Sequence, residues 1–235
     1  MDFTQLLQTY QPSKDQVANL QDVSLCLLVG ISGAGKDTTK RHLMTTGRYF
    51  NFISYTTRAP RENNGVMEKD GEDYYFISLA EAQQMLEKGE FIEAKEYAGN
   101  VYGTGFRELR KARQEGKIAI NDVEVQGVSE YKLLLPQTIA VFILPPSYSE
   151  WRRRIASRYA SEAELEGVWP KRREAAIREL EHALKVPYYH FVINDDLEAS
   201  IAAVEKIVEA GDTFHRKDDE ARLLARDLLE EIKAN

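Results

Sequence analysis

The stretch LCLLVGISGAGKDTT, from Leu25 to Thr39, decides the fold class. Its first five residues are apolar, as is typical of a buried strand, and a polar segment compatible with a helix follows Lys36. The residues between them have the spacing G-x-x-x-x-G-K, so backbone N–H groups, the helix N-terminus and the lysine charge can converge on a polyphosphate. The predicted phosphate loop consists of Gly30, Ile31, Ser32, Gly33, Ala34, Gly35, Lys36, Asp37 and Thr38.

Strand-like and helix-like segments alternate along the rest of the chain. The runs 117–125, 138–144 and 190–194 predict buried strands, and helices are expected at 106–114 and from about Pro170 onward. This alternation implies an α/β fold in which helices cover both faces of a mostly parallel sheet. Ligands of such sheets bind beyond the carboxyl ends of the strands, which is where the phosphate loop and Asp122 both fall.

The composition is that of an ordinary globular protein. The chain has 235 residues, 43% of them hydrophobic and 29% charged, which is enough for one α/β domain with smaller inserted lobes. A net charge of −7 argues against a nucleic-acid binder, and a single cysteine, Cys26, leaves no pair for a disulfide. Because no apolar run reaches membrane-spanning length and the N-terminus lacks a signal-peptide form, we expect a cytoplasmic enzyme that binds neither nucleic acid nor membrane.

A second cluster of polar residues lies between residues 54 and 104. Arg58 and Arg61 stand three apart in a loop stiffened by Pro60, and two guanidinium groups in a stiff loop suit a phosphate monoester. Glu93 and Thr104 supply a carboxylate and a hydroxyl group. That pair suits guanine, because the carboxylate accepts from the ring N–H and the amino group while the hydroxyl donates to the carbonyl oxygen.

Seven motifs follow the phosphate loop in order. They read SYTTRAPR (54–61), GEDYYF (71–76), EFIEA (90–94), GNVYGT (99–104), DVEVQG (122–127), PPS (145–147) and VINDDL (192–197). With these motifs, residues 24–210 resemble the guanylate kinase family. The resemblance implies a P-loop NTPase three-layer sandwich that transfers the γ-phosphate of ATP to GMP or dGMP with Mg²⁺. It also implies a core (23–53, 105–147 and 185–211), a GMP-binding lobe (54–104) and a lid (148–184), with extra helical segments at 1–22 and 212–235.

The resemblance also implies roles for individual residues. The phosphate loop and Asn194 would bind ATP, and Asp122 would lie near the magnesium ion. The GMP site would consist of Ser54, Arg58, Arg61, Tyr74, Glu93, Tyr102 and Thr104. Lys36, Arg58, Arg154 and Arg172 would act in catalysis, the last two from the lid. The choice among neighbouring basic residues of the lid stays open by one helical position.

Asp37 stands where the loop motif usually has serine or threonine. Its carboxylate is a suitable oxygen ligand for Mg²⁺, either directly or through water. It could instead point away from the phosphates and cap the helix, because helix N-termini favour aspartate. Both interpretations stay open from the sequence.

Two other functions are compatible with parts of the sequence. One is a kinase of the same architecture that acts on a different nucleotide or on a phosphosugar, against which Glu93 and Thr104 argue. The other is a non-catalytic scaffold that binds phosphopeptides, against which the complete phosphate loop argues because a scaffold has no need of a donor site. A monomer and a homodimer are equally compatible with the sequence.

Overall fold

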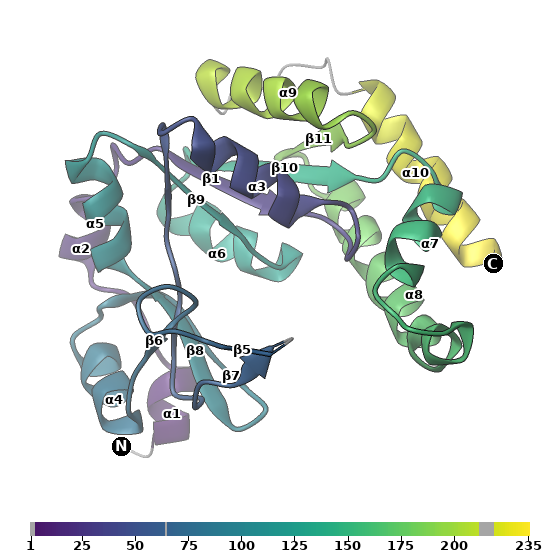
Figure 1. The fold of residues 1–235 in the computed structure, drawn as a ribbon. Helices are drawn as coiled ribbons and strands as arrows, with labels where there is room; N and C mark the ends of the chain where they lie inside the picture. The colour runs from purple at the N-terminus through teal and green to yellow at the C-terminus, as the bar shows by residue number, and fades with distance from the viewer. Residues whose placement is uncertain (1–2, 64, 212–218) are drawn as a thin grey trace. The chain divides into compact units, whose positions relative to one another are not determined.

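The computed structural model describes residues 3–63, 65–211 and 219–235 and shows a mixed α/β fold with a mostly parallel central sheet (Figure 1). The chain divides into two compact units. Unit 1 comprises Met1–Leu25, Arg48–Asn121 and Ser129–Gln137, and unit 2 comprises Cys26–Gly47, Asp122–Val128 and Thr138–Asn235. No helix of the described ranges combines the length and the apolar character that a membrane span requires.

Unit 2 is built on three parallel strands in the order β11-β10-β1. These are β1 (Leu25–Val29), β10 (Ile139–Leu144) and β11 (Tyr189–Ile193), and every residue of β1 and β10 is buried. Strands buried on both faces read as continuous apolar runs, as the sequence predicts here. The helices of this unit are α3 (Lys36–Thr45), α7 (Tyr148–Ala156), α8 (Glu162–Lys185), α9 (Leu197–Ala210) and α10 (Asp219–Ala234).

Unit 1 contains the parallel pair β2 (Tyr49–Asn51) and β9 (Ile118–Asp122) and a separate four-stranded sheet. That sheet has the order β6-β3-β8-β7, from β3 (Tyr55–Thr56), β6 (Tyr75–Phe76), β7 (Phe91–Tyr97) and β8 (Asn100–Gly105). A small hairpin of β4 (Glu62–Asn63) and β5 (Val66–Met67) lies in the polar loop between β3 and β6. The helices are α1 (Phe3–Gln8), α2 (Lys14–Ala18), α4 (Leu79–Glu87) and α5 (Phe106–Gln114).

The two terminal segments pack against their own units. At the N-terminal end, Tyr10 accepts a 2.9 Å hydrogen bond from the Phe91 backbone N–H, and the two rings lie edge to face. At the C-terminal end, Arg173 of α8 donates a 2.7 Å hydrogen bond to the Ile232 carbonyl of α10. Leu228 and Ile232 are buried, so the apolar face of α10 serves the core of unit 2, as its periodicity predicts. The apolar periodicity of the sequence predicts this helix from Asp218 to Ala234, and Asp218 lies outside the described residues.

Two predicted boundaries were wrong. The strand expected at 117–125 ends at Asp122, and a helix that was not predicted, α6 (Val125–Leu134), follows. The helix expected from Pro170 begins eight residues earlier, at Glu162, where the Ser161 hydroxyl accepts a 3.3 Å bond from the Glu164 N–H. A capping serine defines a helix start more strongly than a proline, and Pro170 is accommodated inside α8.

Candidate active site

The phosphate loop has the backbone geometry that its glycines predict. Gly30 has a φ of +137°, and a Cβ atom there would lie 2.3 Å from the Ile143 carbonyl oxygen of β10. Gly35, with a φ of +103°, occupies the N-cap position of α3. A Cβ at Gly35 would lie 2.0 Å from the Asn194 side-chain nitrogen, so only glycine fits at either position. The loop therefore turns sharply from β1 into α3 and presents its backbone N–H groups.

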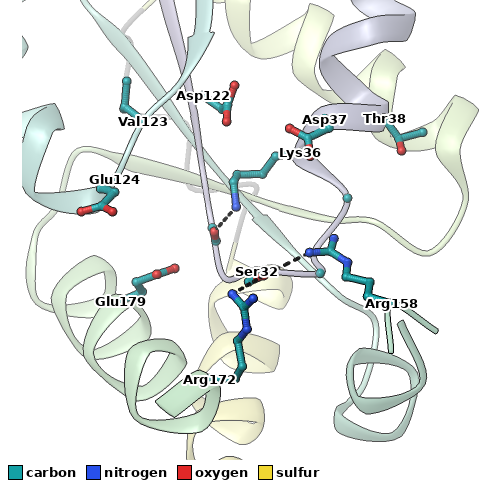
Figure 2. Close-up of a pocket in the computed structure, with 13 residues that line it drawn as sticks. Ser32, Lys36, Asp37, Thr38, Asp122, Val123, Glu124, Arg158, Arg172 and Glu179 are labelled. Carbon is teal, nitrogen blue, oxygen red and sulfur yellow. Dashed lines mark hydrogen bonds between the residues drawn. The ribbon is translucent and has the colours of Figure 1, made fainter. Parts of the chain in front are cut away.

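This loop borders a cavity of about 400 Å³ within unit 2 (Figure 2). Three cationic side chains line it, from Lys36, Arg158 and Arg172. Four carboxylates line it as well, and these belong to Asp37, Asp122, Glu124 and Glu179. A cavity with a glycine-rich loop, cations and carboxylates is equipped to hold a polyphosphate together with a metal cation.

Lys36 lies at the centre of this cavity. Its ammonium group donates to the carbonyl oxygen of Gly30 and, at 3.4 Å, to that of Ile31. Burial lowers the pKa of Lys36, and the carboxylates of Glu179 and Asp122 oppose this effect. The charged ammonium therefore rests on the loop carbonyls, from which it can turn to a phosphate that enters the cavity.

Two carboxylates, those of Asp37 and Asp122, line the cavity near the N-terminus of α3. The N-cap of α3 is Gly35, and Asp37 lies in the first turn of the helix, where its charge is favourable to the helix dipole, and also lines the cavity. Asp122, at the end of β9, forms an ion pair with Lys40. The described residues form no cluster of three or more potential metal ligands. One or two carboxylates completed by phosphate oxygens is the usual arrangement for Mg²⁺, and the donor set here fits that ion.

Glu179 of α8 was not among the predicted site residues. Burial raises the pKa of Glu179 to about 7, an effect that the Lys36 ammonium opposes and the Glu124 carboxylate reinforces. In Figure 2 its carboxylate points into the cavity from α8. The sequence held no signal for it, because a glutamate on a charged amphipathic helix is most often exposed.

The arginines that line the cavity differ in part from those predicted. Arg158 and Arg172 each donate to the Ser32 hydroxyl, at 3.3 and 3.4 Å. Arg154 instead makes a 2.7 Å ion pair with Glu150 and donates to the carbonyl oxygens of Ala34 and Asn194, at 3.3 and 2.9 Å. In this structure Arg154 supports the loop through its carbonyl contacts, and Arg158, four residues later and just past the end of α7, lines the cavity.

Asn194 follows β11 and is 7% exposed. Its side-chain nitrogen donates a 2.7 Å hydrogen bond to the Ala34 carbonyl, and its side-chain oxygen accepts from Ser200 at 3.3 Å. The Trp151 ring nitrogen holds the loop in the same way, at 2.8 Å from the Ser32 carbonyl. In this structure Asn194 therefore fixes the shape of the loop and does not line the cavity.

Unit 1 brings together all seven residues predicted for the second site. Arg58 makes a 2.8 Å ion pair with Glu68, and Arg61 approaches the same carboxylate at 3.3 Å. The Arg61 backbone N–H also donates to Glu68, at 3.0 Å. Hydrogen bonds from Arg58 lower the pKa of Glu68 to about 2, although burial acts in the opposite direction. One buried carboxylate thus orients both arginines, and sequence reasoning had missed it.

The tyrosines of this site surround Arg58. Its guanidinium donates a 3.1 Å hydrogen bond to the Tyr102 hydroxyl and lies 5.4 Å from the centre of the Tyr74 ring. The rings of Tyr74 and Tyr102 meet edge to face at 6.1 Å. Arg58 is therefore held rigidly, while the Arg61 side chain is 63% exposed and is available to an anion.

Glu93 and Thr104 lie directly opposite each other on β7 and β8. Burial raises the pKa of Glu93, and a hydrogen bond with the Thr104 hydroxyl opposes this effect. The Ser54 hydroxyl lies 3.5 Å from that of Thr104. A carboxylate and two hydroxyl groups are thus gathered on a framework of paired strands, as base recognition would require.

Comparison with known proteins places the chain in a family. Residues 23–211 match the family model described as guanylate kinase. The chain belongs to the guanylate kinase family. It is 36% identical over 182 residues to the guanylate kinase of Trichormus variabilis, which covers 77% of this chain and 87% of the relative. It is 35% identical over 187 residues to that of Geobacter metallireducens, covering 79% and 88%.

A solved structure agrees with this placement. The crystal structure of guanylate kinase from Anaplasma phagocytophilum matches with a TM-score of 0.57 and 25% identity, covering 89% of this chain and 94% of that one. Members of the family with these names are nucleoside monophosphate kinases, and this chain is an enzyme of that class. The guanylate kinase motifs identified in the sequence lie within the matched residues.

Proposed function

We propose that this guanylate kinase family member transfers the γ-phosphate of ATP to GMP or dGMP, giving ADP and GDP or dGDP, in a reaction that depends on Mg²⁺. The observation that carries the proposal is the convergence of the glycine-rich loop, Lys36, Arg158 and Arg172 on one cavity. Membership of the family supports the choice of a monophosphate acceptor.

The donor would occupy the cavity of unit 2. Loop N–H groups and the N-terminus of α3 would bind its phosphates, and Lys36 would leave the Gly30 carbonyl to contact them. Arg158 and Arg172 would leave the Ser32 hydroxyl and bind the phosphoryl group in transfer. Arg154 remains a candidate for this role if its bond with Glu150 opens.

Mg²⁺ would be held by Asp37 and Asp122, directly or through water, and would neutralise negative charge on the donor phosphates when bound. Asp37 and Asp122 both line the cavity that holds Lys36, which supports this assignment. Asp122 would retain its contact with Lys40, so this lysine sets the position of the carboxylate.

The acceptor would bind in unit 1. Ser54, Arg58, Arg61, Tyr74 and Tyr102 would hold its phosphate, and Glu93 and Thr104 would bind guanine. Phosphoryl transfer needs positioning and charge neutralisation and no covalent intermediate on the protein. The acceptor phosphate oxygen attacks the γ-phosphorus in line, the bond to the bridging oxygen breaks, and ADP leaves. The segment 148–184, proposed as a lid, would exclude water from the reacting phosphates.

A coupled assay with ATP and Mg²⁺ against GMP, dGMP, AMP, CMP and UMP tests the proposal. We expect turnover with GMP or dGMP far above that with the other three nucleotides. Equal or better turnover of a non-guanine nucleotide would contradict the substrate assignment. Absence of turnover with every nucleotide would contradict the kinase assignment and favour the phosphopeptide-binding scaffold.

Lys36→Ala tests the donor site in the same assay. We expect kcat/KM to fall by about 10²-fold or more, because a positioned charge on the transferring phosphate is lost. Lys206→Ala, which removes an exposed lysine from α9, is the matched control and should keep normal turnover. A Lys36→Ala variant with wild-type circular dichroism and near-normal kcat/KM would refute the mechanism.

A further inference from the structure

Tyr131, on α6, carries a buried hydroxyl group that lies near the Thr104 hydroxyl without making a hydrogen bond of ordinary length and angle. The residue is 1% exposed, and among the described residues its hydroxyl has no hydrogen-bond partner. Its ring packs against that of Phe52, with the centroids 6.3 Å apart. A phenylalanine would pack in the same way and would avoid the cost of burying an unsatisfied hydroxyl. A hydroxyl at this position therefore calls for a partner in another state of the protein.

The surroundings of Tyr131 are the residues proposed to recognise guanine. Glu93 and Lys95 stand two apart on β7, so their side chains share one face of the sheet, and Thr104 lies opposite Glu93. Glu130, the neighbour of Tyr131 in sequence, makes a 2.7 Å ion pair with Lys95. This ion pair holds the second half of α6 against the face of the sheet that carries Glu93 and Thr104.

The electrostatics of Tyr131 agree with this placement. Burial first, and then the charges of Glu93 and Glu130, raise the pKa of Tyr131 well above its ordinary range, while the Thr104 hydroxyl acts in the opposite direction. The phenol therefore keeps its proton at neutral pH and can serve as a donor. The Thr104 hydroxyl has two lone pairs that can accept and one proton that it can donate.

We propose that Tyr131 is a positioning residue for guanine recognition, whose hydroxyl donates to Thr104 when the base is bound. The inference rests on the proposed function. Guanine bound at Glu93 would satisfy that carboxylate with its ring N–H and amino group. The Thr104 proton would then turn to the carbonyl oxygen of guanine. This rotation aims a lone pair of the Thr104 oxygen at Tyr131, from which it would accept. Adenine has an amino group in place of the carbonyl, so the same relay has no acceptor to serve.

Tyr131→Phe is the first test, because it removes the hydroxyl and keeps the ring. We expect KM for GMP to rise about five- to tenfold, which corresponds to one hydrogen bond, with kcat within about twofold of wild type. The thermal midpoint should be equal or higher, because an unsatisfied buried hydroxyl is gone. Tyr49→Phe removes the hydroxyl of another fully buried tyrosine, on β2 and outside the proposed sites, and is the matched control. It should leave KM for GMP unchanged.

A double-mutant cycle with Thr104→Val tests whether Tyr131 acts through Thr104. In the Thr104→Val background, Tyr131→Phe should change the inhibition constant of GMP by less than about twofold. In the wild-type background, Tyr131→Phe should weaken binding of IMP as much as binding of GMP, since IMP keeps the carbonyl oxygen. Tyr131→Phe should not weaken binding of 2-aminopurine ribonucleoside monophosphate, because this nucleotide lacks the carbonyl oxygen.

The outcomes separate this inference from the proposed function. A wild-type enzyme that does not phosphorylate GMP would refute the proposed function and the inference with it. An active wild type with an unchanged GMP KM in Tyr131→Phe would refute the inference alone. A lowered thermal midpoint in Tyr131→Phe would show that the hydroxyl stabilises the protein without ligand, and this would refute the inference. Additive effects of Tyr131→Phe and Thr104→Val on GMP binding would refute it as well.

Discussion

Asp37 is the residue at which this chain departs most clearly from the usual phosphate-loop motif. A serine or threonine at that position offers a neutral hydroxyl, whereas Asp37 brings a negative charge into a cavity that would receive phosphates. The structure places that charge in the first turn of α3 and on the cavity wall, so both the helix dipole and a cation in the cavity can stabilise it. The Asp37 carboxylate would repel the donor phosphates, and a cation bound between them would offset this repulsion.

Asp37→Ser should therefore change how much Mg²⁺ the enzyme requires. If Asp37 is a ligand, the Mg²⁺ concentration that gives half-maximal rate at saturating ATP and GMP should rise several-fold, because a hydroxyl binds the cation more weakly than a carboxylate. The measurement is a Mg²⁺ titration of the rate at constant free ATP. Asp227→Ser, at an exposed position of α10, is the control. An identical Mg²⁺ requirement in Asp37→Ser and wild type would discard the ligand assignment.

The β4–β5 hairpin shows how an element places side chains that the sequence presents only as a polar loop. Its base is closed by the Glu68 N–H, which donates to the Arg61 carbonyl at 3.0 Å. The Glu68 side chain accepts in return from the Arg61 N–H and forms ion pairs with Arg58 and Arg61. The hairpin thereby orients two arginines that stand three apart in sequence on one carboxylate, at the place proposed to bind the acceptor phosphate.

Glu68→Gln should disturb this anion site without removing either arginine. We expect KM for GMP to rise about tenfold or more, because the ion pairs that orient both guanidinium groups lose their charge. The KM for ATP should stay within about twofold, since every contact of Glu68 described here lies in unit 1. Glu62→Gln, an exposed carboxylate on β4 of the same hairpin, is the control. Equal increases of both KM values in Glu68→Gln would show a general loss of folding and contradict a positioning role.

Element boundaries that depend on local signals were predicted well. The spacing S-x-x-E at Ser78 and Glu81 predicts a capping box that opens a helix ending at Gly89, and the structure has this box at the start of α4 (Leu79–Glu87). The start of α8 was missed because its signal, Ser161, competes with a proline that suggests a later start. Helix α6 was missed because the apolar residues of DVEVQG read equally well as the end of a strand.

At the scale of the whole molecule, the half-buried carboxyl group of Glu179 links stability to pH. The pKa of Glu179 is raised from 4.5 to about 7, chiefly by burial. Between these two values the folded chain keeps a proton on Glu179 that the unfolded chain has already lost. By linkage, the contribution of this group to the free energy of unfolding falls as pH rises through that window.

Glu179→Gln should remove that dependence, because glutamine does not titrate. Relative to wild type, the variant should gain stability as the pH is raised from about 5 to about 8. Urea unfolding at both pH values, followed by circular dichroism, measures the difference. Glu198→Gln, at an exposed position of α9, should show no such change. A constant stability difference between Glu179→Gln and wild type at the two pH values would contradict the raised pKa.

The sequence by itself determined the phosphate loop and the alternation of strands and helices, and it singled out Glu93 and Thr104, which the structure pairs across β7 and β8. These depend on local spacing, on the positions of glycines and on the period of apolar residues, all of which are local properties of the sequence. Only the tertiary structure decided that Arg158 lines the cavity while Arg154 supports the loop. It alone also showed that Glu68 orients both acceptor-site arginines, and that Tyr131 is buried beside Thr104. The rotation of a helix about its axis and contacts between distant segments fix such placements, and neither is visible in a linear pattern.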